Sequence, residues 1–242
     1  MPDRAVSESW WNSIVEVDEV RFTTDDGVSL EGELRLPSIQ ARGSAVVCHA
    51  DPRQGGSKDH PVLWAIRNEL STRGFAVLSF NFRGVMRSGG SFSAGRGEVG
   101  DAAAAIARVR ETADGPTLVC GWSFGANVAL REAVPDERVA ALALVGLPLG
   151  ESAVDLPDLP GPSELRVLGI PVLLASGQGD TISPRPELET LARKLPQAEV
   201  AIVPGTDHFF WHREKELAGR IADFADEVLA TAARGGERPR SR

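Results

Sequence analysis

The amino-acid sequence predicts an α/β fold in which a mostly parallel sheet is covered on both faces by helices. The chain has 242 residues, 42% of them hydrophobic, which suits one domain with a sizeable core. After residue 37, short solid apolar runs alternate with segments of helical spacing, as is typical of strands buried on both faces. Before residue 37, apolar and polar positions alternate, which indicates a half-exposed antiparallel hairpin.

The hairpin is the first predicted element. It covers residues 15–36, with the turn signal Asp25-Asp26-Gly27 between two alternating halves. Six apolar runs then predict buried strands at 44–48, 75–80, 117–120, 139–145, 170–175 and 200–203. Helices are expected at 61–73, about 97–112, 124–133, 184–195 and 213–233. This order predicts about seven or eight strands, right-handed crossovers, and functional residues at the carboxyl ends of the strands.

The domain organisation is expected to be simple, because no repeat and no interdomain linker is visible. We expect an N-terminal tail at 1–13, one domain at 14–233 and a disordered, basic C-terminal tail at 234–242. Residues 147–162, which are rich in proline and glycine, are expected to form a long loop.

Charge and composition exclude several classes of partner. The net charge of −8 disfavours nucleic acid as the main partner, because phosphate binding needs clustered Lys and Arg. No run approaches the ~20 apolar residues that span a bilayer, and the N-terminus does not resemble a secretory signal. We therefore expect a cytoplasmic protein that does not bind membranes, as a monomer or homodimer. Cys48 and Cys120 are expected to be buried reduced thiols, the alternative being a disulfide between neighbouring strands.

The strongest local signal is the pattern Gly121-Trp122-Ser123-Phe124-Gly125, which follows a predicted strand and opens a predicted helix. Glycines two residues either side of a serine allow the tight turn that brings backbone segments together. Such a turn would present the Ser123 hydroxyl above the sheet and direct the Phe124 N–H at a developing oxyanion. The alternative is an ordinary helix-entry turn with serine as the cap.

A nucleophilic serine needs a histidine that takes its proton, later in the chain. His208 follows the last apolar strand and precedes the final amphipathic helix, so it is the predicted general base. His212 is expected to be a surface or packing residue, His49 to be structural and close to the site, and His60 to lie in the cap region of a helix.

The histidine in turn needs a carboxylate that orients it. Asp180 lies in a glycine-rich turn after the strand at 170–175 and is the predicted acid, although aspartate is also an ordinary turn residue beside glycine. Asp155, Asp158 and Asp207 are the competing candidates. Asp207 is weakened as a candidate because adjacent side chains usually point apart. The chain order Ser, Asp, His differs from the orders of the chymotrypsin and subtilisin types.

The segments GWSFG, GQGD and GTDHFF, together with NFRGVMRSGGS at 81–91, resemble a small α/β-hydrolase of the dienelactone-hydrolase-like bacterial group, over roughly residues 15–230. The resemblance implies the α/β-hydrolase fold, a nucleophile elbow at Ser123, and a catalytic triad completed by Asp180 and His208. Larger members of this fold insert a lid after the strand that corresponds to 139–145. This chain has only the loop around 147–166 there, so a minimal lid or none is expected.

The resemblance also implies the second donor of the oxyanion hole. It places this backbone N–H on the loop after strand 44–48, at Asp51, as partner to the Phe124 N–H. Many relatives have His-Pro-His-Pro at this point, whereas this chain has Ala50 and Asp51. An ionised carboxylate beside an oxyanion opposes it, so the Asp51 side chain is expected to turn away into solvent, the alternative being an ion pair with Arg53 or Lys58.

These features predict a serine hydrolase that cleaves carboxylic esters of small molecules through an acyl-enzyme, with no metal and no cofactor. An acyl thioesterase, an acyltransferase with the same triad, and a ligand-binding protein that retains the fold are the alternatives. Trp122 and His49 are candidates for substrate binding. Arg83 resembles the structural arginine of the family and is expected to clamp a loop.

Overall fold

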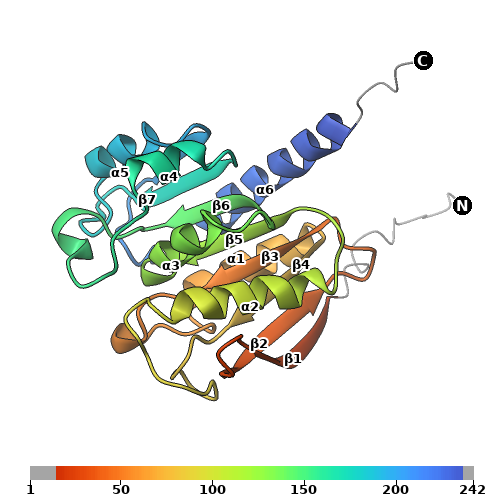
Figure 1. Ribbon diagram of the computed structural model, residues 1–242. Coiled ribbons are helices and arrows are strands. Elements are labelled where there is room, and N and C mark those ends of the chain that lie inside the picture. The colour runs from red at the N-terminus through yellow and green to blue at the C-terminus, as the bar shows by residue number, and fades with distance from the viewer. Residues whose placement is uncertain (1–14, 237–242) are drawn as a thin grey trace, which may run out of the picture.

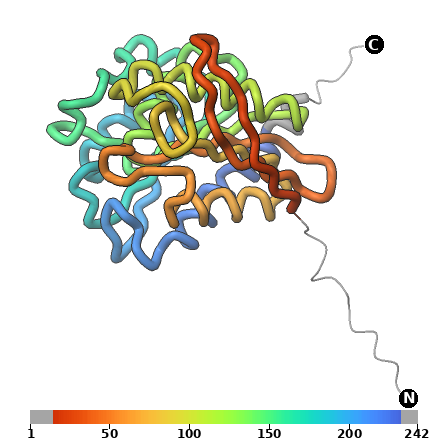
Figure 2. Tube along the Cα trace, turned by 90° about the horizontal axis from the view of Figure 1, so that it is seen from below, coloured from red at the N-terminus to blue at the C-terminus, as the bar shows by residue number. Residues whose placement is uncertain are grey.

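The computed structural model describes residues 15–236 and begins with the predicted hairpin. Strands β1 (Glu16–Thr23) and β2 (Ser29–Leu36) pair antiparallel around a turn in which Gly27 has a φ of 83°. The two strands lie side by side at one edge of the molecule (Figures 1 and 2). The predicted N-terminal tail at 1–13 lies outside the described residues, as does the C-terminal segment 237–242.

The sheet has eight strands in the order β1-β2-β4-β3-β5-β6-β7-β8. β2 pairs antiparallel with β4, and the remaining strands are parallel to one another. These strands are β3 (Gly43–Cys48), β4 (Phe75–Phe80), β5 (Thr117–Trp122), β6 (Val139–Val145), β7 (Val172–Gly177) and β8 (Ala198–Val203). The prediction of a mostly parallel sheet with an antiparallel N-terminal hairpin is confirmed.

Helices cover both faces of the sheet (Figure 1). One face packs against α1 (Pro61–Thr72) and α6 (Glu214–Gly236), and the other against α2 (Glu98–Arg110), α3 (Phe124–Ala133), α4 (Pro162–Val167) and α5 (Arg185–Ala192). Along β3, Val46 and Cys48 point into one core while Ala45 and Val47 point into the other. Burial on both faces explains why this strand is a solid apolar run in the sequence.

Two details differ from the sequence-based expectation. The expected loop after β6 contains a 3₁₀ turn, η2 (Gly150–Ala153), and ends in the short helix α4. Pro162 occupies the first turn of α4, and the Glu164 carboxylate accepts from the Gly161 N–H at 2.7 Å. In α4 only Leu165 is buried, so the sequence carries no helical periodicity there. The last helix also continues to Gly236, past the expected domain end at residue 233.

The two cysteines are free and buried, as expected. They lie on the neighbouring strands β3 and β5, but Cys48 points into one core and Cys120 into the other. The sheet therefore separates the two thiols, which removes the disulfide alternative. Within residues 15–236, no helix is both long enough and apolar enough to cross a membrane.

Candidate active site

Ser123 occupies the sharp turn between β5 and α3. Its φ of 57° and ψ of −118° lie outside the regions that L-residues usually adopt, and its N–H donates to the Val145 carbonyl at 2.8 Å. A Cβ atom at Gly121 would lie 2.2 Å from the Gly125 carbonyl oxygen, and one at Gly125 would lie 2.4 Å from the Cys48 carbonyl oxygen. Glycine is required at both positions because the backbones touch. The turn holds the serine side chain half-exposed above the strand ends.

The structure brings Ser123, His208 and Asp180 into one hydrogen-bonded chain. His208 Nε2 lies 2.9 Å from Ser123 Oγ, and His208 Nδ1 lies 2.9 Å from Asp180 Oδ2. Asp180 Oδ1 accepts from the N–H groups of Ile182 and Ser183 at 2.8 and 2.9 Å. Burial raises the pKa of Asp180, but the hydrogen bonds from His208 and these two N–H groups outweigh it, so the pKa is lowered.

An ionised Asp180 can only accept hydrogen bonds, so it fixes the tautomer of the histidine. Nδ1 carries the hydrogen and donates it to the carboxylate, which leaves Nε2 free to accept from the serine hydroxyl. This protonation is what a general base next to a serine requires.

Trp122 is buried and holds the histidine loop in place. Its indole Nε1 donates to the His208 carbonyl oxygen at 3.2 Å. The loop can approach closely because Gly146 has no side chain, and a Cβ atom there would lie 2.9 Å from His208 Cε1. The proposal of Trp122 as a substrate-binding residue needs correction, since its side chain is 2% exposed and faces the core cluster that includes Phe210.

The loop after β3 carries Asp51, whose carboxylate pairs with Arg53, the alternative to the expected turn into solvent. The carboxylate caps the 3₁₀ turn η1 (Pro52–Gln54) by accepting from the Arg53 N–H at 2.8 Å, and Arg53 Nη2 donates to it at 2.7 Å. Lys58 pairs with Asp59 instead. Among the described residues, the backbone N–H groups of Asp51 and Phe124 have no hydrogen-bond acceptor.

His49 is structural and cannot contact a substrate. It is fully buried, its Nε2 accepts from the Phe82 N–H at 3.1 Å, and its Nδ1 lies 2.7 Å from the carbonyl oxygen of the next residue. Burial lowers the pKa of His49 to about 4, so the ring is neutral at pH 7. The proposal of His49 as a substrate-binding residue is therefore wrong, because both ring nitrogens are used inside the protein.

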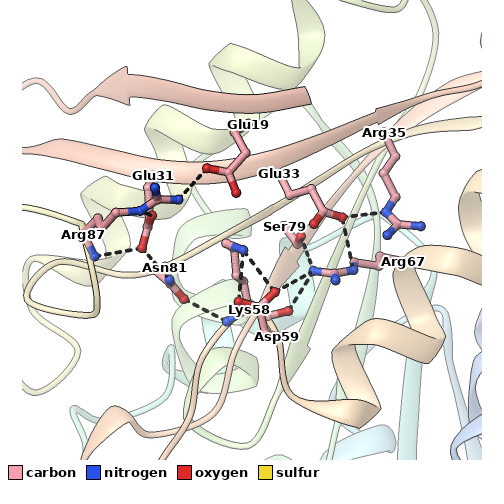
Figure 3. Close-up of polar contacts among 10 residues, drawn as sticks. All are labelled: Glu19, Glu31, Glu33, Arg35, Lys58, Asp59, Arg67, Ser79, Asn81 and Arg87. Carbon is pink, nitrogen blue, oxygen red and sulfur yellow. Dashed lines mark hydrogen bonds and ion pairs between the residues drawn. The ribbon is translucent and has the colours of Figure 1, made fainter. Parts of the chain in front are cut away.

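Asn81, which follows β4, is a residue that the sequence analysis missed. Its Oδ1 accepts from the Lys58 N–H at 2.8 Å, and its Nδ2 donates to Glu31 Oε1 at 2.9 Å. Figure 3 shows Asn81 between the Lys58 backbone and the hairpin carboxylate, inside a larger group of ion pairs. Asn81 thus ties the end of the Asp51 loop to the sheet. The available signal was a polar residue directly after a solid apolar strand.

Arg83 clamps the hairpin turn to α2, as expected. It donates to Asp26 at 2.8 Å and to Asp101 at 2.8 Å, and its backbone N–H also donates to Asp101, at 2.9 Å. Both ends of its guanidinium are occupied by carboxylates, so it stabilises the fold.

The other aspartates and histidines that were considered for the triad do not take part in its hydrogen-bonded chain. Asp207 accepts from the Phe209 N–H at 3.0 Å, so its carboxylate caps a turn. Among the described residues, neither Asp155 nor Asp158 contacts His208 by a hydrogen bond or ion pair. His60 caps α1 through a hydrogen bond from the Val62 N–H. His212 is exposed at the surface.

Comparison with known proteins agrees with this architecture. Residues 45–233 match the family described as Alpha/beta hydrolase domain. The chain is 28% identical over 214 residues to Uncharacterized protein RP471 of Rickettsia prowazekii (strain Madrid E), with 85% of this chain and 87% of that protein covered. The structure of ATU1826 from Agrobacterium tumefaciens superposes with a TM-score of 0.76 at 27% identity, covering 88% of this chain and 97% of that one.

A third similar protein is XC6422 from Xanthomonas campestris, described as a member of a/b serine hydrolase without lid. It superposes with a TM-score of 0.71 at 27% identity, covering 94% of this chain and 97% of that chain. The family match spans more than half of this chain and includes the turn at Ser123, the loop at Asp180 and the loop at His208. The chain belongs to the α/β-hydrolase family, as its sequence motifs predict.

Proposed function

We propose that this protein is a serine hydrolase that cleaves carboxylic esters of small molecules through a covalent acyl-enzyme. The observation that carries the proposal is the continuous hydrogen-bonded chain from Ser123 Oγ through His208 to Asp180. The strained turn at Ser123 supports it, because such a conformation is typical of functional residues. The likeness to XC6422, which is described as a serine hydrolase, supports the reaction class.

In the proposed first step, His208 Nε2 takes the Ser123 proton while the serine oxygen attacks the ester carbonyl carbon. The negative charge that develops on the carbonyl oxygen is stabilised by the backbone N–H groups of Phe124 and Asp51, each of which contributes about 3 kcal/mol to lowering the barrier. The protonated histidine then gives its proton to the departing alcohol, which leaves an acyl group on Ser123.

In the second step, His208 takes a proton from water as the water attacks the acyl-enzyme. The same oxyanion donors stabilise the second tetrahedral anion. As this anion collapses, the protonated His208 returns the proton to Ser123 Oγ, which releases the carboxylic acid and restores the free enzyme. The Asp51 carboxylate does not oppose either anion strongly, because its charge is neutralised by the hydrogen bonds and ion pair with Arg53.

Esters of varied size can reach the site because little covers it. The segment between β6 and β7, where larger relatives insert a lid, holds only η2 and the short helix α4. The description of XC6422 as lacking a lid is in keeping with this.

The proposal is tested with p-nitrophenyl esters and acyl thioesters of graded acyl length. We expect ester turnover that Ser123→Ala removes while the protein stays folded by circular dichroism. Faster thioester turnover at matched acyl length would favour a thioesterase, and product formed on an added alcohol would favour an acyltransferase. A folded wild-type protein that turns over neither class would favour the ligand-binding alternative.

A further inference from the structure

Two exposed aromatic side chains follow the histidine of the proposed triad, and one of them contacts its ring. Phe209 is 41% exposed and Trp211 is 52% exposed, and their rings stack at 6.4 Å between centroids with an interplanar angle of 21°. The Phe209 ring stands edge-on to the His208 imidazole, with 5.7 Å between the ring centroids. We call these two side chains the aromatic shelf.

The backbone of this segment is strained in a way that produces the shelf. Phe210 and His212 have φ values of 54° and 62°, in the left-handed region that side chains other than glycine rarely adopt. Phe210 is fully buried, so the chain turns twice to place its two neighbours outward while Phe210 enters the core. Strain of this kind persists only where the surrounding structure enforces it.

Hydrogen bonds at both ends of the segment hold this conformation. Asp207 accepts from the Phe209 N–H at 3.0 Å, and the Arg213 N–H donates to the Phe210 carbonyl at 2.8 Å. Behind the shelf, His60 lies 4.3 Å from Trp122 and 6.2 Å from Trp211 between ring centroids. The shelf is therefore fixed by hydrogen bonds, and its Trp211 ring contacts the His60 ring behind it.

The position of the shelf relative to His208 identifies what it would bind. In the proposed reaction, His208 Nε2 must give its proton to the oxygen of the departing alcohol, so that oxygen comes within hydrogen-bond reach of the imidazole. In the same reaction the ester carbonyl oxygen is bound by the N–H groups of Phe124 and Asp51 and not by His208. A side chain that flanks the imidazole thus flanks the alcohol part of the ester rather than the acyl part.

We propose that Phe209 and Trp211 form the binding surface for an apolar alcohol group, an alkyl chain or a ring, so that the natural substrates are esters of large hydrophobic alcohols. This inference rests on the proposed function. Neither shelf residue carries charge, and their faces offer dispersion and hydrophobic contact to carbon chains.

The inference is tested by varying the alcohol and the acid separately. Alkyl acetates from ethyl to hexyl lengthen only the alcohol, and ethyl esters from acetate to hexanoate lengthen only the acyl chain. Acid release on a pH-stat gives kcat/KM for both series. Full burial of a methylene improves binding about fourfold, and a one-sided surface supplies about half of that free energy, so we expect roughly a twofold rise in kcat/KM per alcohol methylene.

Phe209→Ala and Trp211→Ala are each expected to reduce the ratio of kcat/KM for hexyl acetate to that for ethyl acetate about fourfold. The slope of a series is the change in log kcat/KM per added methylene, and the slope of the acyl series should stay that of wild type. Ile39→Ala is the matched control, because Ile39 is exposed and apolar but precedes β3, at the opposite end of the parallel strands. It should change neither slope. Phe209→Ala could act by displacing the His208 imidazole, which the Phe209 ring contacts. Trp211→Ala excludes this explanation, since among the described residues Trp211 makes no ring contact with His208.

A wild-type alcohol series with no slope, or slopes unchanged in both shelf variants, would overturn the inference while leaving the ester hydrolase in place. Loss of slope in the acyl series instead would assign the shelf to the acyl side and also refute the inference. A folded protein that hydrolyses no ester of either series would refute the proposed function, and the inference with it.

Discussion

Replacing Asp180 with asparagine changes one atom of the site and leaves its shape intact. The backbone N–H groups of Ile182 and Ser183 both donate to Asp180 Oδ1, at 2.8 and 2.9 Å. In Asp180→Asn the amide oxygen must stay at this position, because an NH₂ group there would face two donors. The NH₂ group therefore takes the place of Oδ2, 2.9 Å from His208 Nδ1.

That arrangement forces His208 into the wrong tautomer. Nδ1 must now accept, so the ring hydrogen moves to Nε2, which can then no longer take the serine proton. The same substitution in a well-studied triad lowers kcat about 10⁴-fold, equivalent to about 5 kcal/mol, and we expect a loss of that size. The folded state loses one charge-assisted hydrogen bond and keeps two others, so the free energy of unfolding should fall by about 1 kcal/mol and Tm by about 2–4 °C.

The assay is single-turnover and steady-state hydrolysis of p-nitrophenyl acetate, with Tm measured on the same samples. Asp207→Asn serves as the matched control, because Asp207 is adjacent to His208 in the chain but caps a turn instead of orienting the imidazole. Near-normal kcat in Asp180→Asn, or an equal loss in Asp207→Asn, would refute the assignment of Asp180. A protein that no longer folds would show itself in Tm and would contradict the predicted small cost.

Three further predictions concern stability and reactivity. The hydrogen bonds that an arginine and a threonine make to Asp26 lower its pKa to about 2, below the unfolded value, so its stabilising contribution is present above pH 4 and lost as the pH falls toward 2. The difference in Tm between wild type and Asp26→Asn should shrink over that range, and a constant difference would contradict the ion pair. Burial raises the pKa of Cys120 to about 12 and also raises that of Cys48, so a disulfide exchange reagent should modify neither thiol until the protein is unfolded. Rapid modification of the native protein would contradict the burial of these thiols. Asp51→Ala removes the cap of η1, so it should lower the free energy of unfolding by about 1 kcal/mol and also lower kcat/KM. Asp51→Asn should retain most activity, because its amide oxygen can still accept from the Arg53 N–H. Equal losses of kcat/KM in the two variants would show that the negative charge itself is needed.

Much of the fold follows from the sequence because its signals are local. The central parallel strands are buried on both faces, so β3, β4 and β6 are visible as solid apolar runs. In β1 the less exposed Val20 and Phe22 alternate with exposed residues, which makes the hairpin visible as an alternation. The helix α4 could not be predicted in this way, because only one of its side chains enters the core.

The candidate triad was predictable because it depends on chain order and on loops that follow strands. Ser123, Asp180 and His208 each lie after a parallel strand, and the parallel arrangement brings those strand ends to one edge. Chain order does not determine the direction in which a side chain points. Proximity in the chain suggested Trp122 and His49 as substrate-binding residues, but both point into the interior.

The exposure of the aromatic shelf could not be predicted from the sequence either. His208, Phe209, Phe210 and Trp211 are consecutive, and the sequence gives no sign of which side chains are buried. Which of these side chains are exposed depends on positive φ values at two positions that are not glycine, and tertiary packing determines those values.

The most direct test of the proposed nucleophile is covalent labelling with a fluorophosphonate, followed by intact-mass measurement and peptide mapping. The triad predicts one adduct per chain, located on Ser123, formed much more slowly in Asp180→Asn and absent in Ser123→Ala. A folded wild-type protein that stays unlabelled, or an adduct located on any other residue, would contradict the assignment of Ser123 as the nucleophile.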